Sequence, residues 1–189
     1  MSERQFEFRV VAGSLKGRVI HTPDLGITRP PLTRLRKAVF DFLNPYLQNA
    51  AYLDLFSGSG SYLFEAVSRG ADLCRGVEVN DRLAAAINRE AERLKIDRKL
   101  FCYCENVFAA LPRLEAEGRR FDIVMIAPPQ YQGLIDRTLS ALAEHTLTAE
   151  KALILCQHDS SETKDIEFGA FETLQQLKYG NTTYTVLTA

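Results

Sequence analysis

From Ala51 onward, short runs of apolar residues alternate with longer stretches in which apolar residues recur every three or four positions. Continuous apolar runs are typical of strands buried on both faces, and the wider spacing is typical of helices with one buried face. The alternation predicts an α/β fold with a mostly parallel sheet. We expect its strands near residues 52–56, 73–79, 100–105, 122–127 and 152–158.

The segments between and after these strands complete the expected sheet. The stretches 81–94 and 134–144 each carry one apolar face and predict helices that cover the sheet. The end of the chain breaks the alternation, because the strand-like runs 171–179 and 182–188 flank Gly180-Asn181, a typical hairpin turn. We therefore expect seven strands, mostly parallel, with a terminal antiparallel hairpin.

The first 50 residues differ in pattern from the rest. We expect two short strands, at 6–11 and 18–21, joined by a turn at 13–17. A loop marked by Pro30-Pro31 follows, and then a helix from Thr33 to about Asn44 that ends at Pro45. Leu35, Val39, Phe42 and Leu43 form the apolar stripe of this helix, and Arg34, Arg36 and Lys37 are expected to project elsewhere.

Charge divides the chain at the same point. Residues 1–50 have a formal balance of +4, and residues 51–189 have −5. A basic segment on an acidic body indicates contact with a polyanion such as RNA, although a merely solvated charged surface is the alternative. We therefore expect a basic RNA-contacting extension at 1–50 and a catalytic or binding domain at 51–189.

Composition narrows the class of protein. A hydrophobic share of 46% and a charged share of 25% are ordinary for a globular chain. No apolar stretch approaches the roughly 20 residues of a membrane helix, and the first five residues lack the apolar core of a secretion signal, so we expect a cytoplasmic protein. Cys74, Cys102, Cys104 and Cys156 lie in strand-like runs without metal-ligand spacing, which predicts reduced core thiols and no metal site.

The most informative segment is the apolar run that ends in Ser57-Gly58-Ser59-Gly60. Two glycines directly after a buried strand allow backbone angles closed to other residues and let a ligand lie against the main chain. Leu63 replaces the third glycine of the dinucleotide fingerprint, which disfavours a nicotinamide cofactor. S-adenosylmethionine has no pyrophosphate to bind, so this turn suits it better.

Polar residues follow the other expected strands, and ligands of open α/β sheets bind at the carboxyl ends of strands. Glu78 has the spacing at which an acid reaches ribose hydroxyls, with a solvated strand-end glutamate as the alternative. Asp54 lies inside an apolar strand and needs partners, either loop amides or the amino group of the cofactor. Asn106 either contacts an adenine edge or caps the helix that begins at Val107.

Three motifs together resemble a known family, the bacterial small-subunit rRNA guanine-N2 methyltransferases of the RsmD type. They are Arg9 to Arg18, Arg29 to Lys37, and Asp54 to Gly60 followed by Glu65 to Ala71. In the second motif Pro31 stands where the family usually has threonine. The resemblance implies a Rossmann-like class I methyltransferase fold and transfer of a methyl group from S-adenosylmethionine to the exocyclic amine of a guanine.

One departure from the family concerns the loop after the fourth strand. The family usually has Asp-Pro-Pro followed by Tyr or Phe, whereas this chain has Ala127-Pro128-Pro129-Gln130, with Tyr131 one place later. In the family, the acid that is missing here accepts hydrogen bonds from the amine. The Pro128 carbonyl, the Gln130 side chain and Tyr131 are possible replacements, and Tyr131 either stacks on the base or packs on the adjacent helix.

The sequence therefore predicts a guanine-N2 methyltransferase, with a silent RNA-binding relative or a small-molecule methyltransferase as alternatives. It leaves open which guanine is modified, whether naked RNA or a ribonucleoprotein is the substrate, and whether the chain dimerises; we expect a monomer. The expected catalytic residues are Pro128, Pro129, Gln130 and Tyr131. The expected cofactor contacts are Asp54, Phe56, Ser57, Gly58, Gly60, Glu78, Val79, Asn106, Val107 and Ala127. The expected RNA contacts are Arg9, Lys16, Arg18, Arg29, Arg34, Arg36 and Lys37.

Overall fold

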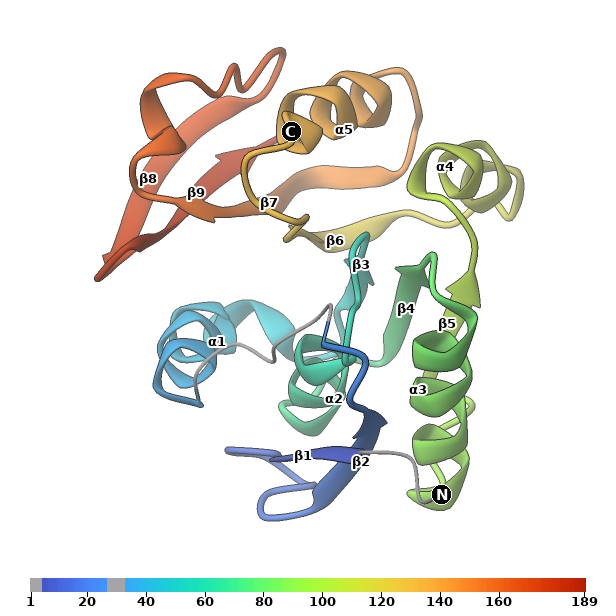
Figure 1. Ribbon diagram of the computed structural model, residues 1–189. Coiled ribbons are helices and arrows are strands. Elements are labelled where there is room, and N and C mark those ends of the chain that lie inside the picture. Colours follow the sequence, from blue (N-terminus) through green and yellow to red (C-terminus); the bar gives the residue numbers. More distant parts are fainter. Residues whose placement is uncertain (1–4, 27–32) are drawn as a thin grey trace.

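A seven-stranded sheet forms the centre of the protein (Figure 1). The computed structural model describes residues 5–26 and 33–189. The strand order is β5-β4-β3-β6-β7-β9-β8, and all neighbours are parallel except β9, which runs antiparallel to both β7 and β8. The strands are β3 (Ala51–Asp54), β4 (Leu73–Glu78), β5 (Leu100–Cys104), β6 (Phe121–Ile126), β7 (Thr148–Asp159), β8 (Glu172–Tyr179) and β9 (Thr182–Thr188).

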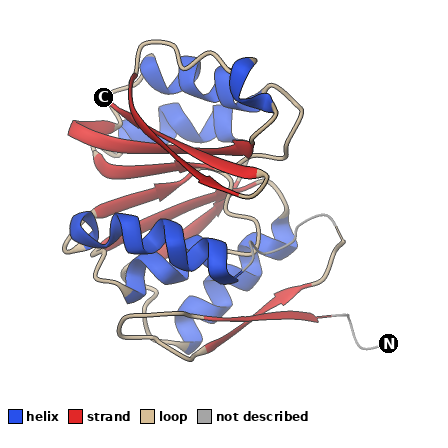
Figure 2. Cartoon of the chain, turned by 90° about the vertical axis from the view of Figure 1, so that its left-hand side faces the viewer, coloured by secondary structure: helices blue, strands red, loops and turns tan. Residues whose placement is uncertain are grey.

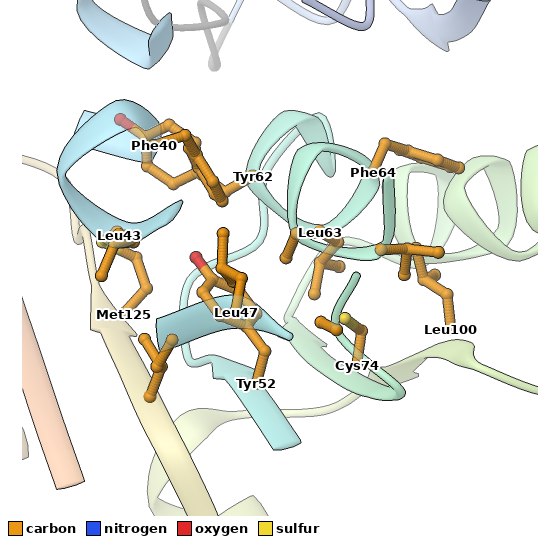
Figure 3. Close-up of a cluster of buried hydrophobic side chains, with 14 of the residues drawn as sticks. Phe40, Leu43, Leu47, Tyr52, Tyr62, Leu63, Phe64, Cys74, Leu100 and Met125 are labelled. Atoms are coloured by element: carbon orange, nitrogen blue, oxygen red, sulfur yellow. The ribbon is translucent and has the colours of Figure 1, made fainter. Parts of the chain in front are cut away.

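Helices cover both faces of this sheet (Figure 2). One buried cluster joins the sheet to α1 (Thr33–Leu47), α2 (Ser61–Ser68) and α3 (Asp81–Arg93), and Figure 3 shows part of it around Tyr52 and Phe64. A second cluster joins the opposite face to α4 (Val107–Ala116) and α5 (Leu134–Ala143). A short 3-10 helix, η1 (Glu162–Lys164), follows β7. The expected mostly parallel sheet with a terminal hairpin is therefore confirmed.

The strands lie where the sequence pattern predicts them, with one large difference in length. β7 begins at Thr148, four residues before the expected 152–158 strand, and the polar residues Glu150 and Lys151 are exposed in it. A strand that projects beyond its apolar centre gives no continuous apolar run, so its first residues were not recognisable from the sequence. Among the described residues, no helix is long and apolar enough to cross a membrane.

Helix α1 continues through Pro45 to Leu47, so the expectation that Pro45 ends it is wrong. Proline inside a helix costs about 3 kcal/mol because it removes one backbone hydrogen bond. Leu43 and Leu47, on either side of the proline, are both fully buried in the core. Burial of a leucine stabilises by about 1.5–3 kcal/mol, so the packing of Leu47 offsets the cost of the last turn.

A two-stranded antiparallel hairpin, β1 (Gln5–Arg9) and β2 (Val19–Pro23), lies beside α2 and α3 and outside the central sheet (Figure 1). The loop after β1 is bound to α2, since the buried carboxylate of Glu65 accepts hydrogen bonds from the amides of Val11 (3.0 Å) and Ala12 (3.1 Å). A Cβ atom on Gly13 would lie 1.8 Å from the Ser68 carbonyl oxygen. The loop of the hairpin therefore packs so closely against α2 that position 13 requires glycine.

Candidate functional site

The carboxyl ends of β3, β4 and β6 lie next to one another and carry the predicted site residues. Asp54 is paired with Gly76 of β4 on one side and with Met125 of β6 on the other. The Leu55 amide extends this pairing by donating to the Met125 carbonyl (3.0 Å). The glycine turn (residues 54–60) after β3 and the proline loop (residues 127–133) after β6 therefore begin side by side, as the carboxyl-end rule predicts.

The glycine turn is fastened to the neighbouring strand. The Ser57 amide donates to the Val77 carbonyl (2.9 Å), and the Gly60 amide donates to the Ser57 carbonyl (2.7 Å). Gly58 and Gly60 both have positive φ, 50° and 77°. A Cβ atom on Gly60 would lie 2.7 Å from the Ile87 side chain, so backbone angle and lack of space both require glycine here.

Glu78 connects the glycine turn to the start of α3. Its carboxylate accepts from the Gly58 amide (2.7 Å) through Oε2 and from the Asn80 amide (2.9 Å) through Oε1. Each carboxylate oxygen has a second acceptor site, so the side chain can still accept two hydroxyl groups. The next residue, Val79, is apolar and 71% exposed, so it offers an apolar surface beside that carboxylate.

Asp54 is a buried acid with one unpartnered oxygen. The side chain is 1% exposed, and Oδ1 accepts from the Phe56 amide (3.2 Å). Oδ2 has no hydrogen-bond partner in the described part of the chain. Burial raises the pKa of the Asp54 carboxyl to about 7, and the nearby charge of Glu78 adds to the effect. An ammonium group at this point, such as that of the methionine part of S-adenosylmethionine, would supply the missing donor.

The other expected cofactor contacts surround the same strand ends. Phe56 is half-buried, Ser57 is buried, and Val107 is buried at the start of α4. Asn106 caps α4, because its side chain accepts from the Phe108 amide (2.9 Å). Of the two roles expected for Asn106, the helix cap is the one observed. Asn106 is exposed, so its amide nitrogen is still available to a ligand.

The proline loop lies along a cavity of about 280 Å³ between β7, η1 and the start of α5. Pro128 is buried, whereas Gln130 is exposed and Tyr131 is 67% exposed. Tyr131 has a φ of 59°, which is unfavourable for a bulky residue, and its amide donates to Glu162 Oε1 (2.8 Å). The loop conformation is therefore stabilised by a carboxylate from a distant part of the chain.

Four residues of this region were not among the predicted site residues. Glu162 holds Tyr131, and Gln157 and His158 line the cavity at the end of β7. The carboxyl-end rule, extended to the fifth parallel strand, selects Gln157 and His158. No local signal marks Glu162. Gly76 allows the turn to approach, because a Cβ atom there would lie 2.5 Å from Ser57 Oγ, and its environment is visible only in the folded chain.

The predicted RNA contacts divide into exposed and buried residues. Arg36 is only 1% exposed, so the expectation that it projects away from the apolar stripe is wrong. Its guanidinium donates to the Arg9 carbonyl (2.6 Å) and lies 3.6 Å from Glu65, over the Phe8 ring. The hairpin covers this side of α1, and Glu65 compensates the buried charge. Arg29 lies outside the described residues, and the exposed members are Arg9, Lys16, Arg18, Arg34 and Lys37.

Three of the four cysteines lie in the core of the protein. Cys74, Cys102 and Cys156 are buried, as expected, and burial raises the pKa of each thiol. Cys104 is exposed at the end of β5, so the expectation of a core thiol is wrong there, because the strand ends at the surface. Within the described ranges, no group of three or more His, Cys, Asp or Glu residues is arranged to hold a metal ion.

Comparison with known proteins gives matches over nearly the whole chain. The family model described as conserved hypothetical protein 95 matches residues 8–188. The ribosomal RNA small subunit methyltransferase D of Escherichia coli is 28% identical over 153 residues, which cover 81% of this chain and 75% of the relative. The family-model match includes the glycine turn and the proline loop.

Solved structures agree with the observed topology. A hypothetical protein from Thermus thermophilus is 26% identical and superposes with a TM-score of 0.79, covering 96% of this chain and 99% of the other. An RNA methyltransferase from Salinibacter ruber, in complex with S-adenosyl-L-homocysteine, is 12% identical and has a TM-score of 0.66, with 85% and 93% covered. The second likeness shows the fold alone, and that fold is the class I methyltransferase fold.

Proposed function

The chain belongs to the conserved hypothetical protein 95 family, and from this premise we propose that it methylates the exocyclic N2 amine of a guanine in small-subunit rRNA, using S-adenosylmethionine. The family membership confirms the resemblance to the RsmD type. The Escherichia coli relative is named a ribosomal RNA small subunit methyltransferase, which supports the choice of rRNA as substrate. The observation that carries the proposal is the unpartnered, buried Asp54 oxygen at the glycine turn, directly beside the proline loop.

In this proposal the glycine turn and its surroundings bind the cofactor. Asp54 accepts from the ammonium group, Glu78 accepts from the ribose hydroxyls, and Val79 contacts the adenine ring. Bound S-adenosylmethionine supplies a methyl group on a sulfonium, which a neutral amine can attack. The positive φ of Gly58 and Gly60 lets the main chain approach the ligand without a Cβ atom between them.

The proline loop positions the amine. An exocyclic amine is a weak nucleophile because its lone pair is delocalised into the ring, so an acceptor for its hydrogens and a fixed orientation both assist the attack. Ala127 has no side-chain acceptor, and the Pro128 carbonyl and the Gln130 side chain take that role in this proposal. Tyr131, exposed at the rim of the cavity, stacks on the base.

The amino-terminal extension supplies phosphate contacts. Arg9, Lys16 and Arg18 are exposed on the hairpin, and Arg34 and Lys37 are exposed on α1. Such contacts orient an RNA more than they select its sequence. Replacement of Arg34 by Ala should weaken RNA binding and lower the slope of log affinity against log salt by about 1, whereas Lys178→Ala, on the edge strand β8, should leave the slope unchanged.

A second function is favoured by one observation, the alanine at position 127. Loss of one preorganised polar group can lower a rate by about 10²–10³, so a catalytically silent RNA-binding relative that keeps the cofactor pocket is the rival. Both proteins would bind S-adenosylmethionine, and only the enzyme would transfer the methyl group.

Transfer of tritium from labelled S-adenosylmethionine to rRNA separates the two functions. The substrates are naked 16S rRNA and partial small subunits from a strain that lacks the protein. We expect label in RNA, recovered as N2-methylguanosine after nuclease digestion, and no label with the Gly60→Val variant. Cofactor binding without any transfer to RNA would contradict the enzyme and support the silent relative; label in another nucleoside would contradict the guanine-N2 assignment alone.

A further inference from the structure

Gln157 stands next to the position from which the family's acid is missing. In the parallel pairing of β6 with β7, Ile126 is the partner of Cys156, so Ala127 and Gln157 are the next residues along the two strands. Ala127 packs against the buried cluster that contains Tyr62 and Tyr184. The side chain of Gln157 reaches the same cluster, since it is hydrogen-bonded to Tyr62. Ala127 and Gln157 therefore point to the same face of the sheet.

Two buried tyrosines fix the orientation of the Gln157 amide. The Tyr62 hydroxyl donates to Gln157 Oε1 (2.6 Å), and the Tyr62 and Tyr184 hydroxyls are 2.6 Å apart. A hydroxyl group has a single hydrogen, so Tyr62 receives its own hydrogen bond from Tyr184. The result is a directed chain from Tyr184 through Tyr62 to the Gln157 carbonyl oxygen. Tyr62 packs against Phe40 of α1 in the core (Figure 3), which holds the middle residue of this hydrogen-bond chain in place.

With its oxygen occupied, Gln157 has two amide hydrogens to donate. The residue lines the same cavity as Pro128, Pro129 and Tyr131. Within the described residues, no acceptor is within hydrogen-bond distance of Gln157 Nε2. The Gln157 amide is thus an oriented donor at the end of β7, next to Ala127 and the start of the proline loop, where the reacting amine must lie in the proposed function.

We propose that Gln157 holds the target base beside Ala127 by donating a hydrogen bond from Nε2 to the ring nitrogen next to the amine that is methylated. Bases with an exocyclic amine have such an acceptor, which in guanine is N3. This hydrogen bond fixes the base plane and directs the amine towards Ala127 and the Pro128 carbonyl. The inference rests on the proposed function, because it requires a nucleobase as substrate.

The decisive variant is Gln157→Glu, which keeps the size and the acceptor oxygens but removes the donor at neutral pH. We expect kcat/KM for RNA to fall by about 10-fold to 100-fold, because the variant leaves the acceptor of the base unpaired and places a carboxylate against its lone pair, with the Kd for S-adenosylmethionine unchanged. A protonated carboxyl donates again, so the activity relative to the wild type should rise as the pH is lowered. The ionisable groups near this side chain are Tyr62, Tyr184, His158, Glu162, Asp136 and Asp165.

Tyr62 acts through Gln157 and is a positioning residue. Tyr62→Phe keeps the ring in the core but lets the amide rotate, so we expect a smaller loss, about threefold to tenfold, confined to kcat/KM for RNA. Tyr103→Phe is the matched control. Tyr103 lies on β5, away from the cavity, and this variant removes a tyrosine hydroxyl that is bonded to Glu117 (3.1 Å). It should leave the transfer rate unchanged.

The outcomes distinguish this inference from the proposed function. If the wild-type protein methylates RNA and Gln157→Glu has the same kcat/KM and the same pH profile, Gln157 does not hold the base. If Gln157→Glu loses activity at every pH and also binds S-adenosylmethionine more weakly, the residue supports the fold and the inference is wrong. A wild-type protein that methylates no RNA contradicts the proposed function, and the inference with it.

Discussion

The glycine turn and the proline loop follow adjacent parallel strands, yet they are stabilised in opposite ways. The turn is bonded to β4 through the amides of Ser57 and Gly58, and Gly60 has no room for a Cβ atom. The loop is exposed at Gln130 and Tyr131, and a single carboxylate, Glu162, accepts from the Tyr131 amide. The comparison indicates that the fold fixes the turn proposed to bind the cofactor, while the loop proposed to receive the substrate depends on a contact from a distant residue.

The sharpest test of this contrast compares one glycine from each region. Gly60→Ala introduces an unfavourable φ and a 2.7 Å contact with Ile87, whereas a Cβ atom on Gly133, which also has a positive φ, meets nothing within 4 Å. We expect Gly60→Ala to lower the free energy of unfolding by about 2–5 kcal/mol and Gly133→Ala by about 1–2 kcal/mol. Denaturant unfolding measures both. Equal losses would contradict the contrast.

Ala127→Asp tests the proline loop by restoring an acid at its first position. The carboxylate provides the acceptor that the family pattern has at this position, so kcat for methyl transfer should rise about tenfold or more, while the Kd for S-adenosylmethionine stays near its wild-type value. Single-turnover transfer of labelled methyl groups to RNA measures the change. Ala127→Leu, which adds a side chain of similar size without an acceptor, is the control for size. An unchanged kcat in Ala127→Asp would show that the loop already compensates fully.

Glu78→Gln tests the turn side without changing its shape. Glu78 accepts from two amides, so an amide side chain would place a donor against one of these N–H groups and remove the charge near the ribose. We expect the Kd for S-adenosylmethionine to rise about tenfold, measured by calorimetry. Glu105→Gln alters an ion pair between the end of β5 and Arg113 of α4, and it should leave the Kd unchanged. An unaltered Kd in Glu78→Gln would contradict its assigned role.

The pKa of Asp54, raised to about 7 by burial, makes the turn sensitive to pH. Because this pKa lies above the value in the unfolded chain, the neutral form is favoured by folding, and the contribution to stability falls as the pH rises from about 4 to about 7. Binding of an ammonium group needs the ionised form. The affinity for S-adenosylmethionine should therefore rise by up to about tenfold per pH unit below pH 7 and level off above it.

Calorimetry in buffers of different ionisation enthalpy measures the proton released on binding at pH 6. Asp54→Asn keeps the side-chain volume and should abolish both the proton release and the pH dependence. A flat affinity profile in the wild-type protein between pH 5.5 and pH 7.5 would show that Asp54 is already ionised before the cofactor binds.

The sequence predicted the fold well because the buried strands are continuous apolar runs and the terminal hairpin has its own turn signal at Gly180-Asn181. It predicted the glycine turn because glycine after a buried strand has few structural explanations. It failed at Pro45 and Arg36, where distant residues decide the outcome. Burial of Leu47 keeps the helix intact beyond the proline, and Glu65 with the Arg9 carbonyl provides the buried partners of the Arg36 guanidinium.

What the sequence by itself determined is therefore the parallel sheet, the position of the glycine turn and the family to which the chain belongs. Local signals suffice for these, since strand periodicity and glycine placement depend on nearby residues. Only the tertiary structure decided that Glu162 holds the proline loop, that Asp54 keeps an unpartnered oxygen, and that Tyr62 and Tyr184 orient Gln157 beside Ala127. These contacts join residues 31 to 122 positions apart, and no local pattern encodes them.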